Sequence, residues 1–313
     1  MLVAIGKQNS FSLTSELFPK TLDEDVNYVL NTSSNEYYEK SHLAHLSIKF
    51  ASSGSAVWET DSGRFEANTS GYLVLNPHQD YSVTVTSPTM ASGTIIFLSS
   101  RLAADVHRSL TTETRQLLDH PEVSADRSLE FVERLYPHDN IVSPVMGRLA
   151  RSITTHATSR CSFEDELHRL VEQLLVVQNR ICRAEMMLLP ATRPATRYEL
   201  YRRIYRARDY IMASMDQPLT LHEMSRIACL SPNHFIRTFK HMFQMTPYRF
   251  LTEQRLKRAM ELLADTELSI TEITLMVGFE SLGSFSWLFR RRLGISPLEF
   301  RMQNRKRKIV LTV

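Results

Sequence analysis

The sequence predicts an α+β protein in two parts: an N-terminal antiparallel β-sandwich or β-barrel with helices, followed by an all-α part. Three observations lead to this fold class. Polar and apolar residues alternate between turn signals over residues 43–98, a heptad stripe runs through residues 163–188, and one helical pattern occurs twice after residue 198. With 313 residues, 43% of them hydrophobic, the chain is long enough for two cores, and its composition excludes wholesale disorder.

Residues 43–98 are rich in β-branched and aromatic residues, and clusters of Ser, Gly, Asn and Pro interrupt them about every 8 to 12 residues. Leu46 and Ile48 alternate with Ser47 and Lys49, which predicts a strand with one buried and one polar face. Several such strands separated by turns indicate an antiparallel sheet that closes as a sandwich or barrel. We expect no helix in this region.

Helical patterns begin near residue 100. We predict helices over residues 101–119 and 126–136 and a longer one over residues 163–188. The longer helix carries apolar residues spaced alternately four and three apart, which marks a helix whose seam packs against another element. Two partners are open: the same helix in a second subunit, giving a homodimer, or the outside of the protein's own barrel. The candidate seam residues are Leu167, Leu170, Leu174, Val177 and Ile181.

Two prolines within residues 189–198 end this helix, and the charge of the chain changes at the same place. Residues 1–197 carry a net charge of −5, and residues 198–313 a net charge of +8. A basic second part indicates a polyanionic partner, with chance unevenness and a solvated tail as the alternative. The predicted organisation is an N-terminal domain over 1–188, a linker over 189–198, a C-terminal domain over 199–304 and a basic tail over 305–313.

The basic part contains an internal repeat with a period of about 50 residues, over about 221–242 and 269–292. A turn with Cys229 in one copy and Gly278 in the other leads to a second helix, which carries two phenylalanines four residues apart. Two short helices joined by a tight turn form a helix-turn-helix, and an ordinary helical hairpin is the alternative. In each copy a capping box starts the first helix: Thr220 with Glu223, and Ser269 with Glu272.

The face of each second helix opposite its phenylalanine edge is free to enter a major groove of double-stranded DNA. Asn233 and Arg237 can form bidentate hydrogen bonds with adenine and guanine, worth about 1 to 3 kcal/mol of discrimination for each good pair. The second copy has fewer forked donors, so we expect it to read thymine methyls and backbone shape. The predicted DNA-contacting residues are Asn233, Ile236, Arg237, Lys240, Gly283, Ser286, Trp287 and Arg290.

The segment between the two copies, residues 247–263, has the pattern of one helix with Thr246 as its N-cap. At about 1.5 Å for each residue this helix spans about 25 Å. A rigid helix of that length can hold two reading helices about 34 Å apart, which is one turn of the duplex. One chain can then read two adjacent major-groove segments.

From about Arg206 to Arg301 the sequence resembles the DNA-binding domain of AraC/XylS-type transcriptional regulators. The resemblance implies a bacterial DNA-binding regulator with two helix-turn-helix units, most often an activator, which works with RNA polymerase on the nucleoid. Two residues depart from the family pattern: Trp287 stands where Arg is usual, and Gln244 stands where Gly often closes the first unit. The matching motifs include Pro218-Leu219-Thr220-Leu221, Leu230-Ser231-Pro232, Ile270-Thr271-Glu272-Ile273, Val277-Gly278-Phe279 and Gly294-Ile295-Ser296-Pro297.

The N-terminal half resembles, more weakly, the cupin-like effector domain of the same family. The resemblance rests on the strand-like segment Gly71-Tyr72-Leu73-Val74-Leu75-Asn76-Pro77. It implies a cupin-like antiparallel β-barrel that binds a small-molecule effector, with a neighbouring helix that mediates dimerisation. The candidate effector-binding residues are Trp58, Tyr72, His78 and Tyr81.

Enzyme chemistry has little support in the sequence. His42, His45 and His78 form no H-x-H pair with a downstream Glu, so we predict no metal site. The motifs G-x-S-x-G, G-x-G-x-x-G and G-x-x-x-x-G-K-[ST] are absent. We predict no catalytic residue and no cofactor. A cupin-like metal-dependent enzyme with an accessory DNA-binding domain is the alternative function, and a scaffold that pairs with other regulators is a further one.

The sequence also bears on the compartment. The three cysteines, at positions 161, 182 and 229, lie far apart without a C-x-x-C spacing, which excludes a disulfide scaffold and fits a reducing environment. The longest apolar runs are far shorter than the roughly 18 residues of a membrane helix, and the first residues lack the features of a signal peptide. We therefore expect a cytoplasmic protein with no membrane partner.

Overall fold

The computed structural model describes residues 2–5, 26–41, 45–61, 63–111, 129–155, 160–191 and 193–310. The chain divides into two units, Met1–Asp209 and Tyr210–Val313. The boundary lies inside helix α6 (Pro194–Ala213), and not in the linker predicted over residues 189–198. The reason is that α6 binds the first unit. Asp209 accepts a hydrogen bond of 2.9 Å from the backbone N–H of Leu135, so the first unit extends to Asp209.

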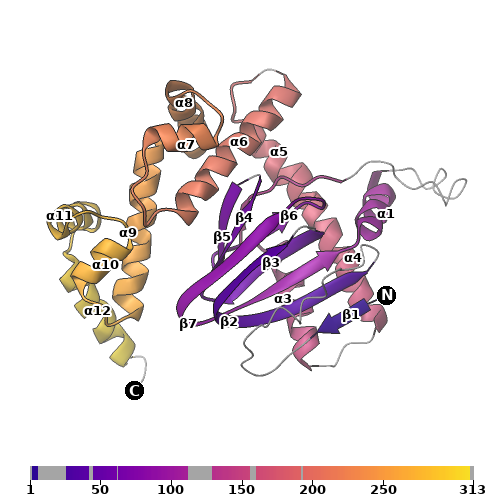
Figure 1. Cartoon of the computed structure of the whole chain (residues 1–313), viewed down its shortest axis with the longest axis horizontal. Helices are drawn as coiled ribbons and strands as arrows, with labels where there is room; N and C mark the ends of the chain where they lie inside the picture. The colour runs from indigo at the N-terminus through magenta and orange to yellow at the C-terminus, as the bar shows by residue number, and fades with distance from the viewer. Residues whose placement is uncertain are drawn as a thin grey trace, which may run out of the picture. The chain divides into compact units, whose positions relative to one another are not determined.

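Unit 1 contains a sheet that curls into a nearly closed barrel (Figure 1). The strand order is β1-β2-β7-β3-β6-β8, with β4 paired to both β5 and β7. Among the described strands the β1–β2 pair is parallel and the other pairs are antiparallel. The barrel predicted from residues 43–98 is confirmed, and strands outside that range complete it. The strands are β1 (Leu2–Ile5), β2 (Asn27–Ser41), β3 (Leu46–Ser53), β4 (Ser55–Thr60), β5 (Gly63–Asn68), β6 (Gly71–Leu75), β7 (Tyr81–Leu98) and β8 (Leu135–Pro137).

Both faces of the sheet are buried over its central strands. The inner face forms the barrel core, to which β6 and β7 contribute Leu73, Leu75, Ile95 and Phe97. The outer face carries a row of register partners that are each 0% exposed: Val29, Ile48, Val74 and Ile96. Helix α3 (Ser143–Thr155) covers part of this outer face, because the Asn31 amide donates a hydrogen bond of 3.2 Å to the carbonyl of Ala150.

The helices of unit 1 follow the predictions in part. Helix α1 (Ser100–Thr111) confirms the start of the helix predicted over 101–119, whose remainder lies outside the described residues. The helix predicted over 126–136 is wrong for its described part. Residues 129–134 are not helical, and β8 pairs with β6 at the sheet edge, so strand pairing overrides the local pattern. The helical segment predicted over 163–188 is continuous as α4 (Arg160–Val176), the π-helical segment η1 (Val177–Cys182) and α5 (Arg183–Met186).

The heptad stripe on α4 and η1 packs inside its own chain. Helix α4 contacts α1 and α3. A side chain that its own chain covers has no surface left for a second subunit. The homodimer seam predicted at these residues is therefore wrong, and the stripe packs internally. Its members are 0% to 3% exposed, apart from the half-buried last one: Leu167, Leu170, Leu174, Val177 and Ile181.

Unit 2 is all helical. Its first helices pack around phenylalanines of α8, and its second core gathers Leu256, Ile273, Phe285 and Phe289 from α9, α10 and α11. The predicted all-α domain with two helix-turn-helix units is thereby confirmed. The helices are α7 (Leu221–Ile227), α8 (Pro232–Phe243), α9 (Pro247–Asp265), α10 (Ile270–Met276), α11 (Leu282–Leu293) and α12 (Pro297–Val310), labelled in Figure 1. The tail predicted over 305–313 belongs to α12 up to Val310, and 311–313 lie outside the described residues.

Candidate nucleic-acid interface

The first helix-turn-helix begins at the predicted capping box. The Thr220 hydroxyl accepts a hydrogen bond of 3.2 Å from the Glu223 backbone N–H, and the Glu223 carboxylate accepts one of 2.8 Å from the Thr220 backbone N–H. These hydrogen bonds from Thr220 hold the pKa of Glu223 below its ordinary value. Two otherwise unpaired amides at the start of α7 are satisfied in this way, so α7 begins where the sequence predicts.

The second helix-turn-helix repeats this construction. The Ser269 hydroxyl accepts a hydrogen bond of 3.1 Å from the Glu272 N–H, and the Glu272 carboxylate accepts one of 2.7 Å from the Ser269 N–H. The second helices differ at their N-caps. Ser281 accepts a hydrogen bond of 3.3 Å from the Ser284 N–H, whereas Ser231 makes no side-chain capping bond and α8 starts on a proline.

Each unit uses the same two left-handed backbone positions. In the turns, Cys229 has φ 50° and Gly278 has φ 85°, and after the second helices Gln244 has φ 56° and Gly294 has φ 80°. A Cβ atom on Gly278 would lie 2.5 Å from the carbonyl oxygen of Met215, so only glycine fits there. Each turn therefore contains one left-handed residue, but the second turn is one residue longer, because four residues separate α7 from α8 and five separate α10 from α11.

Two phenylalanines fix the orientation of each second helix. Phe235 and Phe239 in α8, like Phe285 and Phe289 in α11, are 0% exposed. Within each pair the rings meet edge to face, with centroids 5.4 Å and 5.5 Å apart. Because one edge of each helix is anchored in a core, the opposite face is the one that solvent and ligands can reach.

The exposed face of α8 carries the residues predicted for base reading. Asn233, Arg237 and Lys240 are exposed, and Ile236 is half-buried beside them. Asn233 and Arg237 lie one helical turn apart, so their planar, multi-donor side chains project from the same strip of the helix. The structure thus brings the four predicted residues of the first unit together on one accessible face.

The corresponding face of α11 differs in chemistry. Gly283, Trp287 and Arg290 are exposed and Ser286 is half-buried, so these four predicted residues also share one face. The Trp287 side chain is 60% exposed, and the guanidinium carbon of Arg291 lies 4.9 Å from its ring centroid. Sequence reasoning did not single out Arg291. It adds a positive charge beside the aromatic ring, in a cation–π contact.

Helix α9 joins the two helix-turn-helix units of unit 2 as predicted, although it runs two residues further, to Asp265. The Thr246 hydroxyl caps it by accepting a hydrogen bond of 3.4 Å from the Arg249 N–H. Arg255, near its middle, donates hydrogen bonds of 2.7 Å to the carbonyls of Met215 and Gln217. Arg255 therefore has a structural role in the domain, which ties the segment before α7 to α9.

The four residues predicted to bind an effector do not form one pocket. Trp58 and Tyr81 are buried in the barrel, with ring centroids 5.4 Å apart. Tyr72 lies on the other face of β6, where it stacks on Tyr136 at 5.3 Å, because Leu73 and Leu75 take the inward positions. His78 is exposed in the turn after β6, with φ 62°. Tyr72 and His78 therefore lie away from the barrel interior, and effector binding by any of the four residues stays a prediction.

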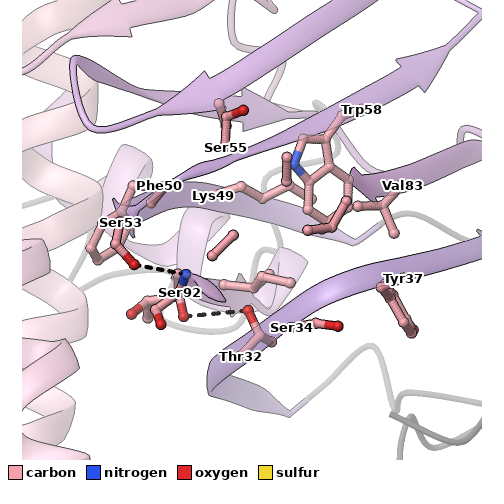
Figure 2. Close-up of a pocket in the computed structure, with 18 residues that line it drawn as sticks. Thr32, Ser34, Tyr37, Lys49, Phe50, Ser53, Ser55, Trp58, Val83 and Ser92 are labelled. Carbon is pink, nitrogen blue, oxygen red and sulfur yellow. Dashed lines mark hydrogen bonds between the residues drawn. The ribbon is translucent and has the colours of Figure 1, made fainter. Parts of the chain in front are cut away.

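A cavity does open at the barrel interior, and Trp58 lines it. Figure 2 shows Lys49 extending toward Trp58 within this cavity. Lys49 is 1% exposed, and its Nζ lies 2.5 Å from the Ser47 hydroxyl. Burial lowers the pKa of Lys49 to about 7. The alternation in β3 is as predicted, but its polar residues Ser47 and Lys49 face the barrel interior and Ile48 faces the outer side, so the predicted inside and outside are reversed.

Two further features of the described residues bear on function. Within the described residues, no three or more His, Cys, Asp and Glu side chains gather into a group that could hold a metal ion. His42 lies outside the described residues, and His45 is buried beside the ring of Phe97, 6.0 Å between centroids. None of the helices in the described ranges is both long and apolar enough to cross a membrane.

Residues 224–303 match a protein-family model described as a helix-turn-helix domain. This range begins within α7, ends within α12 and covers both helix-turn-helix units apart from the first residues of α7. Solved and curated relatives of this part carry the names of AraC-type regulators and operon regulatory proteins. The chain carries the DNA-binding domain of an AraC-type transcriptional regulator. The family assignment rests on the DNA-binding domain.

Individual relatives cover the chain unequally. It is 24% identical to the "Probable transcriptional regulator LumQ" of Photobacterium leiognathi over 209 residues, which are 64% of this chain and 77% of LumQ. It is 37% identical over 93 residues to the transcriptional regulator ArgR of Pseudomonas aeruginosa, 30% of this chain and 28% of ArgR. The solved C-terminal domain of AraT, a response regulator of Geobacillus stearothermophilus, is 34% identical, with a TM-score of 0.32, and the match covers 32% of this chain and 84% of that one.

Proposed function

We propose that this AraC-family protein is a sequence-specific transcription factor whose helices α8 and α11 read two adjacent major-groove segments of one DNA duplex. One observation carries the proposal. Both helix-turn-helix units have a capping box, one left-handed residue in the turn and a buried phenylalanine pair, and each presents one exposed face with an arginine. A rigid α9 of 19 residues, about 28 Å long, separates them.

The two faces are proposed to contribute differently. Arg237 and Asn233 on α8 have the forked donors that pair bidentately with guanine and adenine, so α8 supplies most of the direct base reading. On α11 the exposed Trp287 with Arg291 beside it suits contact with thymine methyls, sugars and phosphates. The first half of the binding site is therefore expected to be the more stringent one.

Gly283 supports a close approach of α11 to DNA. A Cβ atom built on Gly283 meets no heavy atom within 4 Å, so packing inside the protein does not require a glycine there. At the first turn of a helix that enters a groove, a missing side chain leaves room for the phosphate backbone near the helix N-terminus. Gly283→Ala is expected to leave folding unchanged and to weaken DNA binding.

The N-terminal unit is proposed to sense a small molecule, because its barrel encloses the cavity that Trp58 and Lys49 line. We further propose that the protein acts in the cytoplasm on the nucleoid, as an activator that works with RNA polymerase, and that it forms a homodimer. Since the α4 stripe is buried, a homodimer interface would lie elsewhere on the surface. These roles follow from the family resemblance and from the closed architecture of unit 1.

Selection of binding sites from a random DNA library tests the proposed DNA reading. The full-length protein at near-physiological salt is expected to enrich a motif in two parts, about ten base pairs apart. Affinity is expected to fall steeply with salt, because arginines and lysines of unit 2 displace counterions from the phosphates. Residues 198–313 alone serve as the comparison. Enrichment by neither protein would contradict DNA reading, and a one-part motif would limit it to α8.

A further inference from the structure

We propose that the barrel cavity beside Lys49 binds a small monocarboxylate, an organic acid with a short aliphatic or aromatic body. The inference rests on the proposed role of the barrel as a small-molecule sensor and gives the chemical class of its ligand. Three observations support it: a fully buried lysine with no carboxylate in ion-pair contact, a cavity with apolar walls next to that lysine, and hydroxyl groups around the cavity.

The first observation is the unmatched ammonium. Lys49 is 1% exposed, and in the described ranges no carboxylate lies within ion-pair distance of its Nζ. The charge of Glu133 acts on Lys49 only from beyond that distance. Its neighbours are the Ser47 hydroxyl and the rings of Trp58, Tyr81 and Phe97, whose centroids lie 4.8, 5.2 and 5.7 Å from Nζ. Rings and one hydroxyl compensate only part of the cost of removing a charge from water, whereas a carboxylate would complete the compensation.

The second observation is the cavity itself. Its walls are mostly apolar, and they include Ala56, Trp58, Ala67, Val83 and Ile95. Its volume of about 60 Å³ corresponds to roughly four to six water-sized positions, since each takes about 10 to 15 Å³. A carboxyl group with a few carbon atoms fits this space. A sugar or a nucleotide needs more room and more hydrogen-bonding groups than these walls supply.

The third observation is a set of hydroxyl groups around the cavity. Thr32, Ser34, Ser53, Ser55 and Ser92 belong to its lining. Figure 2 shows Thr32, Ser53 and Ser92 across the cavity from Trp58. Apolar walls with a few placed polar groups are typical of small-molecule sites. A single ammonium matches a single negative charge, so a monocarboxylate is favoured over a phosphate or a dicarboxylate, whose second charge would stay uncompensated.

Trp58 gives a direct readout, because the chain has only two tryptophans and the other is Trp287. In full-length protein with Trp287→Phe, the fluorescence of Trp58 reports on the cavity alone. The probes are hexanoate and phenylacetate, and their matched uncharged controls are hexanamide and phenylacetamide. Lys49→Met removes the ammonium at similar side-chain length, and Lys40→Met, an exposed lysine of β2, is the control substitution.

We expect at least one of the two acids to change Trp58 fluorescence with saturation, and its amide to bind at least about tenfold more weakly. Lys49→Met should abolish that preference for the acid, and Lys40→Met should retain it. The acid-to-amide comparison needs no Lys49 variant, so it decides the question even where that variant does not fold. Equal binding of acid and amide would overturn the carboxylate class while leaving a small-molecule site. No binding of either acid would overturn the inference, and the DNA-site selection would still test the proposed DNA reading separately.

Discussion

The buried ammonium of Lys49 makes a quantitative prediction about the stability of the barrel. Replacing it by methionine keeps the length of the side chain and removes the charge. We expect Lys49→Met to raise the free energy of unfolding of unit 1 near neutral pH, and to remove the dependence of that free energy on pH above neutrality. Both effects follow from the position of Lys49, which is 1% exposed among aromatic side chains.

The magnitude follows from the pKa. Burial lowers the pKa of Lys49 from its ordinary 10.5 to about 7. At about 1.4 kcal/mol for each pH unit, that difference corresponds to roughly 4 to 5 kcal/mol at neutral pH. Above pH 10.5 the amine is neutral in both states. As the pH falls from 10.5 to 7, the unfolded chain takes up the proton first, so the barrel loses stability, and below pH 7 the dependence ends.

Other titratable groups near Lys49 do not obscure the pH dependence of stability between pH 7 and 10.5. The charge of Glu133 acts on Lys49 in the opposite direction to burial and is included in its pKa. Burial raises the pKa of Tyr37, which also lines the cavity, so Tyr37 keeps its proton throughout the window. Between about pH 7.5 and 9.5 the unfolding free energy of the unsubstituted barrel should therefore rise by about 2.5 kcal/mol relative to that of the Lys49→Met barrel.

Urea unfolding at several pH values in this window measures the effect, with Trp58 as the fluorescent reporter in a Trp287→Phe background. Free energies come from linear extrapolation to zero urea. Lys40→Met is the matched control, because Lys40 is exposed and its removal should leave the slope with pH unchanged. Parallel pH profiles for the original and Lys49→Met barrels would refute the reasoning, since they would show that the pKa of Lys49 is the same in the folded and the unfolded chain.

Three further predictions concern other parts of the chain. Arg237→Ala should weaken specific DNA binding by about 1 to 3 kcal/mol and relax the base preference at one position in a site selection. Arg258→Ala, which changes an exposed residue of α9, should keep the base preference of the original protein. An unchanged base preference in Arg237→Ala would show that Arg237 does not read a base. Leu174→Ala should lower the unfolding free energy of unit 1 by about 2 to 5 kcal/mol without changing the sedimentation of the protein. Met187→Ala, which changes an exposed residue, should change neither the unfolding free energy nor the sedimentation. Loss of a dimer at unchanged stability would contradict the packing of Leu174 inside its own chain. Gln244→Gly should raise the unfolding free energy of unit 2 by about 0.5 to 1 kcal/mol in thermal melts. A non-glycine residue in the left-handed conformation costs about 1 to 2 kcal/mol, and the greater freedom of glycine in the unfolded chain offsets about 0.4 to 1 kcal/mol of that gain. A lower melting temperature would refute the view that Gln244, at φ 56°, is strained.

The helices of the DNA-binding domain could be predicted from the sequence because the interactions that start and end them are local. Capping boxes act over four residues, so Thr220 with Glu223 and Ser269 with Glu272 gave the starts of α7 and α10. The repeat then supplied independent support for each boundary. Ser231 precedes α8 without a side-chain capping bond, because the proline that follows it already sets the first turn of the helix.

The barrel interior was harder to predict, because alternation separates two faces without saying which is inside. In β3 the apolar Ile48 lies on the outer face against other strands' apolar residues, while Ser47 and Lys49 point inward. A sheet buried on both faces removes the contrast on which a sequence pattern depends. The heptad stripe has the same ambiguity. A spacing of four and three identifies a packed helix face, and Leu174 is 3% exposed because that face meets its own chain.

The predicted linker shows how a correct local signal gives a wrong domain boundary. The prolines do mark a break, since α5 ends at Met186 and α6 begins at Pro194. Proline at the first position of a helix lacks an N–H that would be unpaired there in any case, so it starts α6. The domain does not change at that point, because Arg208 and Asp209 bind the backbone of Leu135 in β8. Burial raises the pKa of Asp209, while Arg208 and the Leu135 N–H act against that increase. This contact joins residues more than seventy positions apart, so no window of the sequence contains it.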